Sequence, residues 1–253
     1  MAGRTKKRIL VADDTLPMRV MLQDVLQEAG YEVITAVDGE EAWNVIQEQT
    51  DQLDLLILDL LMPRMTGFEI LEKLPQIKRP PHQKVLMITG IFKSAKEIDR
   101  LRDLGAAGYI TKSALVDEIL FRVNQVFHLG RENSRRYPRV LYSLPVDYWV
   151  GEQQLSNYSS NFSAGGIFIR TIDPAPPNEL IDISFSIPEL NEQIETTGKV
   201  VWANEYESGA KKPSLPGMGV QFLDLDASLR NKLEEFVKQK LAAEPLWLEN
   251  KPG

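Results

Sequence analysis

The stretch LDLLMPRMTG, residues 58–67, closes an apolar run with a carboxylate and then turns through a proline and a glycine. Residues 53–58 are apolar except for Asp54, which is typical of a strand that is buried on both faces of a parallel sheet. Asp59 is therefore expected at the carboxyl end of that strand. In open α/β sheets, this edge carries the binding site.

The same alternation of apolar runs and amphipathic segments continues on both sides of this stretch. Further runs lie at residues 8–12, 32–36, 85–88 and 108–110, and a helical spacing of apolar residues fills the interval before Gly30. The last helix of the series is expected at residues 114–129. Five repeats of strand and helix predict a flavodoxin-like domain, a doubly wound α/β fold with five parallel strands.

Polar side chains occupy the predicted strand ends. Asp13 and Asp14 follow the first strand and Asp59 follows the third, so three carboxylates are expected in one crevice. They would repel one another without a cation, and Mg²⁺ favours such oxygen ligands. Asp59 is then a candidate nucleophile for a phosphoryl group. Thr89 and Lys112, at the ends of the fourth and fifth strands, are candidates to bind the phosphoryl oxygens.

Residues 1–128 resemble a response-regulator receiver domain through the segments VADD, LDLLMPRMTG, MITG and YITKS. The resemblance implies phosphorylation at Asp59 by a partner sensor histidine kinase. It also implies that the backbone carbonyl of Leu61 joins Asp13, Asp14 and Asp59 in holding Mg²⁺. Tyr109 matches the aromatic switch position of the family, with an ordinary half-buried strand tyrosine as the alternative.

Two positions depart from the receiver pattern. Thr66 stands where the family often has an acidic residue, and Ser113 follows Lys112 where it usually has a proline in a cis peptide. Serine lacks the usual cause of a cis bond, because a non-prolyl cis peptide costs about 2.5–4 kcal/mol. A different placement of the loop that carries Lys112 is therefore an alternative.

The pattern changes after residue 128. The polar segment GRENSRRYPR predicts a linker over residues 129–139. Short runs rich in Val, Ile, Phe and Trp then follow at residues 144–150, 166–171, 179–186, 195–203 and 218–223, and a helical spacing at residues 228–240 begins with Ser228 as the expected N-cap. We expect an antiparallel β-barrel with a C-terminal helix over residues 140–243. Residues 244–253 are expected to form a tail in which Trp247 docks.

The chemistry of the linker and of the segment NFSAGG suits an anionic purine ligand. Arg135, Arg136 and Arg139 offer planar donor forks for phosphate and flat surfaces for stacking. Asn161 and Ser163 have polar groups that can recognise a base. Gly165 and Gly166 allow a tight turn or a close backbone approach.

Residues 131–240 resemble a PilZ domain. Arg135 and Arg139 match its RxxxR motif, and Asn161, Ser163 and Gly166 match its [DN]xSxxG motif. The segments GKVVW and PGMGVQFLDL look like later strands of that family. The resemblance implies binding of the bacterial second messenger cyclic di-GMP, with Trp202 as a weaker candidate to line the ligand.

Composition limits the remaining function classes. The 253 residues contain no cysteine and carry a formal net charge of -7, which argues against thiolate metal sites and general nucleic-acid binding. No signal peptide, membrane span or helix-turn-helix is expected, so we predict a cytoplasmic protein that does not bind DNA. The prediction is a non-enzymatic bacterial regulator with an unidentified downstream target and a possible homodimeric state. The alternative is an adaptor whose two domains dock partners without binding nucleotide.

Overall fold

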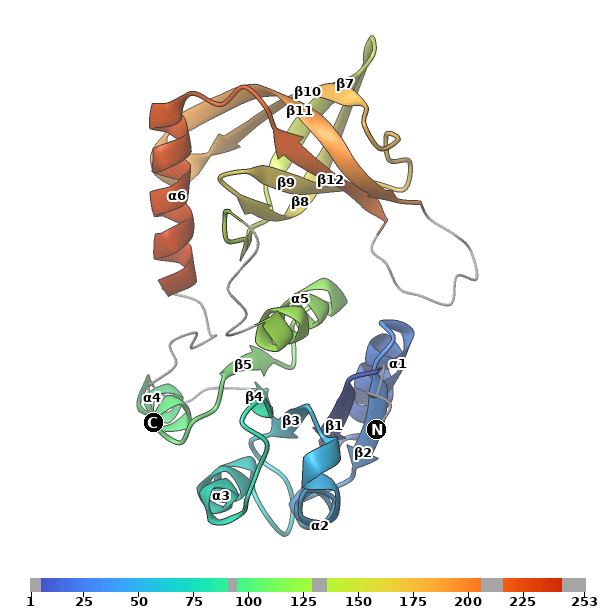
Figure 1. The fold of residues 1–253 in the computed structure, drawn as a ribbon, viewed down its shortest axis with the longest axis vertical. Helices are drawn as coiled ribbons and strands as arrows, with labels where there is room; N and C mark the ends of the chain where they lie inside the picture. The colour runs from blue at the N-terminus through green and yellow to red at the C-terminus, as the bar shows by residue number, and fades with distance from the viewer. Residues whose placement is uncertain (1–5, 91–94, 129–135, 206–215, 243–253) are drawn as a thin grey trace. The chain divides into compact units, whose positions relative to one another are not determined.

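The computed structural model describes residues 6–90, 95–128, 136–205 and 216–242. The chain divides into two compact units (Figure 1). Of the described residues, 6–128 belong to the first unit and 136–242 belong to the second. In the described part of the chain, no helix is both long and apolar enough to cross a membrane. Each unit is described below by itself.

The N-terminal unit is a parallel sheet with the strand order β2-β1-β3-β4-β5. Its strands are β1 (Arg8–Ala12), β2 (Glu32–Ala36), β3 (Leu55–Asp59), β4 (Lys84–Thr89) and β5 (Gly108–Thr111). Its helices are α1 (Leu16–Glu28), α2 (Gly39–Gln49), α3 (Gly67–Lys73), α4 (Ala95–Asp103) and α5 (Val116–His128). The predicted flavodoxin-like domain with five parallel strands is confirmed.

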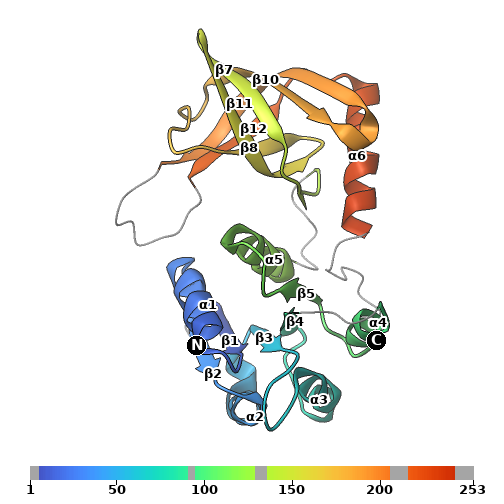
Figure 2. The same cartoon turned by 180° about the vertical axis from the view of Figure 1, so that it is seen from behind.

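Both faces of this sheet are covered, and each covering layer has its own core. Leu22 and Leu26 of α1 pack with Val123 of α5 on one face. Ile46 of α2 and Ile70 of α3 belong to the cluster on the other face. The view from behind in Figure 2 shows the same two layers of helices around the sheet. Because every central strand is buried on both sides, its sequence is largely apolar, and a polar residue ends or directly follows the strand.

The C-terminal unit is an antiparallel barrel. Its strands are β6 (Val140–Leu141), β7 (Pro145–Val150), β8 (Gln153–Ser163), β9 (Gly166–Arg170), β10 (Leu180–Ile187), β11 (Glu192–Asn204) and β12 (Gly217–Phe222). Six of them close in the order β8-β7-β10-β11-β12-β9, because β9 also pairs with β8. The short β6 pairs antiparallel with the C-terminal end of β8. Closure satisfies the backbone groups that a sheet edge would expose. The predicted barrel is therefore confirmed.

Helix α6 (Ala227–Ala242) follows the barrel and buries Leu233, Phe236 and Val237 in the barrel core. The prediction of Ser228 as its N-cap is wrong. The carboxylate of Asp226 accepts hydrogen bonds from the backbone N–H groups of Ser228 (2.8 Å) and Leu229 (3.1 Å), which is the capping geometry. The expected tail and Trp247 lie outside the described residues.

Candidate functional site

Three carboxylates converge at the carboxyl edge of the parallel sheet, as the strand ends predicted. One oxygen atom from each of Asp13, Asp14 and Asp59 lies within 4.8 Å of the others. Asp13 and Asp59 are buried, whereas Asp14 is exposed, so the cluster opens to solvent on one side. An all-oxygen donor set of this kind fits Mg²⁺, which binds through one or two carboxylates and keeps several waters.

Lys112 joins two of these carboxylates. Its Nζ lies 2.8 Å from Asp13 Oδ2 and 2.8 Å from Asp59 Oδ2. Burial alone would lower the pKa of Lys112, but the hydrogen bonds and charges of the two carboxylates together raise that pKa. Burial raises the pKa of Asp59, and the hydrogen bond and charge of Lys112 oppose this effect. Lys112 therefore keeps part of the negative charge of the cluster neutralised.

Asp13 is fixed by the turn that follows β1. Its Oδ1 accepts hydrogen bonds from the backbone N–H (2.9 Å) and the hydroxyl (2.5 Å) of Thr15. Its backbone carbonyl accepts one from Arg19 Nη1 at 2.7 Å. The carboxylate is thus held in one orientation before any cation arrives, which limits the entropy that binding must remove.

The turn after β3 packs tightly against Asp59. A Cβ atom on Gly67 would lie 2.3 Å from the Asp59 carbonyl oxygen, so this position has no room for a side chain. Thr66, the first departure from the receiver pattern, caps α3. Its hydroxyl accepts from the Glu69 backbone N–H, while the Glu69 carboxylate accepts from the Thr66 backbone N–H at 2.7 Å. The backbone N–H of Leu61 points to Asp59 Oδ1 at 3.5 Å.

The remaining receiver candidates lie on β4, β5 and the loop after β5. Thr89 ends β4 and is buried, and Tyr109 on β5 is half-buried against the core. No described peptide bond is cis, including the one between Lys112 and Ser113. Lys112 nevertheless reaches both carboxylates, so the alternative placement of its loop is not needed.

In the barrel, one hydrogen bond links the two predicted ligand motifs. Arg139 Nη1 donates to Asn161 Oδ1 over 3.3 Å. The buried Ser163 hydroxyl donates to the carbonyl of Gly166 at 3.2 Å and accepts from the backbone N–H of Gly165 at 3.3 Å. Ser163 therefore stabilises the β8–β9 turn on which it lies, in addition to any contact with a ligand.

Both glycines of this turn are required by close packing. A Cβ atom on Gly165 would lie 2.4 Å from Cδ2 of Tyr137, and one on Gly166 would lie 2.3 Å from the carbonyl oxygen of Val220. Tyr137, which lies between the motif arginines, was not among the predicted site residues. The signal that could have identified Tyr137 in the sequence was an aromatic residue inside the arginine-rich segment RRYPR. Arg136 lies over this ring, at 5.4 Å from its centroid, and Arg135 lies outside the described residues.

Trp202 lies at the same level of the barrel as Asn161 on β8, because a row of paired residues runs between them across neighbouring strands. Asn161 pairs with Phe168, Phe168 with Gly219 and Gly219 with Trp202 across β8, β9, β12 and β11. The Trp202 and Phe168 rings stack with centroids 5.1 Å apart. A Cβ atom on Gly219 would lie 2.3 Å from Trp202 Nε1, so glycine makes room for the indole. Sequence reasoning missed Phe168, because its stack with Trp202 joins two strands that are distant in the sequence.

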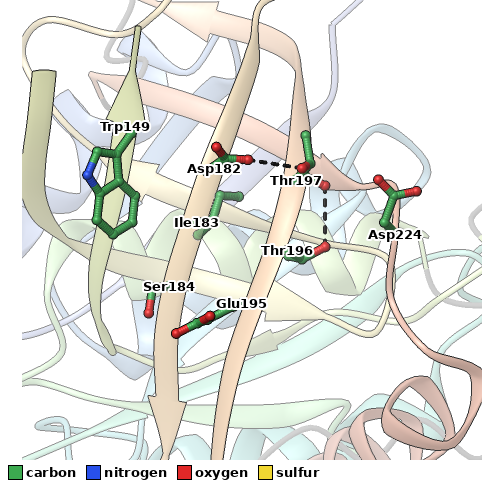
Figure 3. A pocket seen from close by; sticks show the side chains of 8 residues that line it. All are labelled: Trp149, Asp182, Ile183, Ser184, Glu195, Thr196, Thr197 and Asp224. Atoms are coloured by element: carbon green, nitrogen blue, oxygen red, sulfur yellow. Dashed lines mark hydrogen bonds between the residues drawn. The ribbon is translucent and has the colours of Figure 1, made fainter. Parts of the chain in front are cut away.

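A separate hollow of about 620 Å³ lies over β7, β10 and β11 (Figure 3). Trp149 flanks it, and Asp182, Glu195 and Asp224 contribute carboxylates to its lining. The Asp182 carboxylate accepts a hydrogen bond from the Thr197 hydroxyl at 2.9 Å. None of its eight lining residues is basic, so its charge disfavours a ligand with two phosphates.

The comparisons with known proteins agree with this division of the chain. Residues 9–124 match the response regulator receiver domain and residues 133–239 match the PilZ domain. The chain therefore contains a response regulator receiver domain followed by a PilZ domain. Both are signalling modules, and no DNA-binding domain is found.

Curated relatives resemble the receiver half. The chain is 35% identical over 121 residues to the probable transcriptional regulator ycf27 of Cyanophora paradoxa, covering 48% of each chain. It is 37% identical over 124 residues to the alkaline phosphatase synthesis transcriptional regulatory protein PhoP of Bacillus subtilis, covering 47% of this chain and 48% of that one. The chain thus spans about half the length of these relatives.

Among solved structures, the chemotaxis protein CheY4 of Vibrio cholerae is 32% identical to this chain, with a TM-score of 0.45. It covers 48% of this chain, and the match covers 99% of CheY4. The CheX–CheY complex with BeF₃ and Mg²⁺ from Borrelia burgdorferi is 27% identical, with a TM-score of 0.45. That match covers 48% of this chain and 89% of the solved one.

Proposed function

We propose that this protein is a two-input signalling regulator, in which Asp59 accepts a phosphoryl group and the barrel binds cyclic di-GMP. Two contacts carry the proposal: Lys112 bridges Asp13 and Asp59, and Arg139 is joined to Asn161. The first places a cation among clustered carboxylates. The second brings a phosphate-binding group to a base-recognising amide.

In the first input, an Asp59 carboxylate oxygen forms a bond to the phosphorus of a phosphodonor while the bond from phosphorus to the leaving group breaks. A sensor histidine kinase is the proposed donor, so the breaking bond joins phosphorus to a histidine nitrogen. Asp13, Asp14, Asp59 and the Leu61 carbonyl are the proposed holders of Mg²⁺. Bound there, Mg²⁺ supplies positive charge against the charge that develops on the phosphoryl oxygens.

The protein's own residues would then hold the transferred group. Lys112 is close enough to Asp59 to exchange its carboxylate partner for a phosphoryl oxygen, and Thr89 at the end of β4 is the proposed second donor. Tyr109 on the adjacent β5 is the proposed aromatic switch. The half-buried strand tyrosine remains the alternative for that position.

In the second input, the ligand would lie on the outer face of the barrel. Arg135, Arg136 and Arg139 are proposed to contact its phosphates or to stack on its bases. Asn161 and Ser163 are proposed to recognise a base, with Gly165 and Gly166 allowing close approach. The Trp202–Phe168 stack extends this face with a flat aromatic surface, which supports a role for Trp202 in lining the ligand.

The receiver proposal is tested by incubating the protein with Mg²⁺ and a small phosphodonor such as acetyl phosphate. Mass spectrometry should find one added phosphoryl group, which Asp59→Asn should abolish and the exposed-site control Asp51→Asn should preserve. An acyl phosphate at another aspartate would refute the assignment. So would the absence of labelling under conditions that label another receiver domain.

The barrel proposal is tested by calorimetric titration with cyclic di-GMP. Hydrogen bonds to charged groups contribute about 1.5–3 kcal/mol, so Arg139→Ala should weaken binding by tenfold to a hundredfold or more. No binding by the wild-type protein would favour the alternative function, an adaptor that docks partners without nucleotide. Residues 129–139 are the proposed linker between the two inputs, and a downstream protein target completes the proposal.

A further inference from the structure

A hollow of about 670 Å³ lies beside the predicted ligand face of the barrel. Arg136, Tyr137 and Gly165 line one side of it, and Gln221 lies at the end of β12. Helix α6 contributes Arg230 and Glu234. The volume of the hollow is within the range of small-molecule sites, roughly 300–1,000 Å³. Because Gly165 belongs to the β8–β9 turn, the hollow adjoins the proposed cyclic di-GMP site.

Arg230 presents a guanidinium that has no ionic partner in the described part of the chain. Its carbon Cζ lies 5.6 Å from the centroid of the Tyr137 ring, and its Nη1 donates a long hydrogen bond of 3.4 Å to the carbonyl of Ala164. The side chain is half-buried. These weak contacts orient the guanidinium toward the β8–β9 turn and leave its remaining donors for another acceptor.

Glu234 lies one helical turn beyond Arg230, so both side chains leave the same face of α6. It is half-buried at the hollow, and no described basic group forms an ion pair with it. A carboxylate beside a guanidinium offers acceptors and donors together. A ligand with phosphates alone would use the guanidinium and be repelled by the carboxylate.

A guanine base has the complementary arrangement. Its O6 and N7 atoms accept the two donors of an arginine, and its N1–H and N2–H groups donate toward a carboxylate. The exposed Arg136 guanidinium, which lies over Tyr137, offers a plane on which a base can stack. Adenine lacks both the O6 acceptor and the N2 amino group. The hollow therefore has the chemistry to distinguish the two purines.

We propose that this hollow is a guanine subsite, in which Arg230 binds O6 and N7 and Glu234 accepts from N1–H and N2–H. The proposal rests on the proposed binding of cyclic di-GMP, and it adds two specificity-determining residues from α6. The RxxxR and NxSxxG motifs would then hold the rest of the dinucleotide, while α6 recognises a base.

The experiment compares the affinities of the full chain for cyclic di-GMP and cyclic di-AMP by calorimetry. Glu234→Gln and Arg230→Ala should each weaken cyclic di-GMP binding by about tenfold or more and reduce the preference for it over cyclic di-AMP. Glu235→Gln and Lys238→Ala, on exposed positions of the same helix, should change neither quantity. Arg230→Lys keeps the charge without the donor fork, so it should also reduce the preference if the alanine variant does not fold.

The outcomes separate this inference from the proposed function. If wild-type protein binds cyclic di-GMP and Arg139→Ala weakens binding, unchanged affinities in the Arg230 and Glu234 variants would overturn the subsite alone. An equal loss for both dinucleotides in Arg230→Ala would assign that arginine to a phosphate and also overturn it. No cyclic di-GMP binding by the wild-type protein would refute the proposed function and this inference together.

Discussion

Arg139 donates a hydrogen bond to Asn161, so the segment that enters the barrel is joined to β8 across 22 positions of the chain. The two motifs are consequently held together before a ligand arrives. Each residue orients the other, and a ligand that contacts both would lose little entropy in ordering them.

The first prediction concerns this pair. Arg139→Ala and Asn161→Ala should each weaken cyclic di-GMP binding about tenfold or more, and the double variant should lose less than the sum of the two free-energy changes. The reason is that either single change already releases its partner. Calorimetry on the four proteins measures the coupling, with Gln154→Ala on the exposed face of β8 as the control. Fully additive losses would contradict mutual positioning.

The second prediction concerns Gly165 and Tyr137. Gly165→Ala should displace the Tyr137 ring, because the new Cβ would meet it at 2.4 Å. We expect faster amide exchange in the β8–β9 turn, measured by hydrogen–deuterium exchange. In a Tyr137→Ala background the same glycine substitution should have a much smaller effect. Equal effects in both backgrounds would show that the new Cβ clashes with a group other than the Tyr137 ring.

The third prediction concerns Lys112 and the metal. Lys112→Ala removes a positive charge 2.8 Å from two of the proposed ligands, so Mg²⁺ affinity should rise several-fold even as stable phosphorylation falls. A calorimetric Mg²⁺ titration measures the change, and Lys73→Ala at the end of α3 is the control. Weaker Mg²⁺ binding in Lys112→Ala would show that the lysine supports the site rather than competes for it.

The fourth prediction concerns pH and Glu189. Hydrogen bonds from Lys240, at 2.7 Å, and from Tyr142 lower the pKa of Glu189 to about 2. A lowered folded-state pKa means that the contribution is complete above the usual value of 4.5 and is lost as pH falls through about 2. Because the Glu189 side chain is 44% exposed, the contribution is about 1 kcal/mol or less.

Denaturant unfolding of wild type and Glu189→Gln at a series of pH values checks this dependence. The stability difference between the two proteins should be constant near neutrality and shrink between pH 4.5 and 2. It should also decrease in high salt, since exposed pairs are screened. A difference that grows on acidification would contradict the assignment.

The receiver half was predictable in detail, because the change from apolar to polar residues marks where each central strand ends. A strand buried on both faces is an apolar run, so the first polar residues after it, such as Asp13 and Asp59, mark the carboxyl edge of the sheet. The positions of Thr89 and Lys112 followed from the same rule. The pairing of Lys112 with two carboxylates could be seen only in the structure, because it joins residues from three strand ends.

The fold class of the barrel half was predictable, but its individual strands and the start of its helix were less so. Strand β8 was not predicted, because residues 153–163 are mostly Gln, Ser and Asn with few apolar positions. Its pairing with β7 and β9 compensates for that weak local preference. Tyr137, Phe168 and Arg230 were missed because their roles depend on neighbours distant in sequence. Ser228 was predicted as the N-cap, whereas Asp226 is the cap. Both residue types can cap a helix, and only the backbone geometry shows where the helix begins.

The pairing of β9 with β12 has a kinetic consequence. The successive strands β7, β8 and β9 form one half of the barrel and β10, β11 and β12 form the other, so the strands of the two halves pair at the long-range junctions β7–β10 and β9–β12. Such pairings are slow to form, because loop closure must precede them. The Phe168–Trp202 stack spans the second junction. A dinucleotide that contacts both halves would therefore stabilise a long-range pairing, slow the opening of the barrel and lengthen the lifetime of the folded domain.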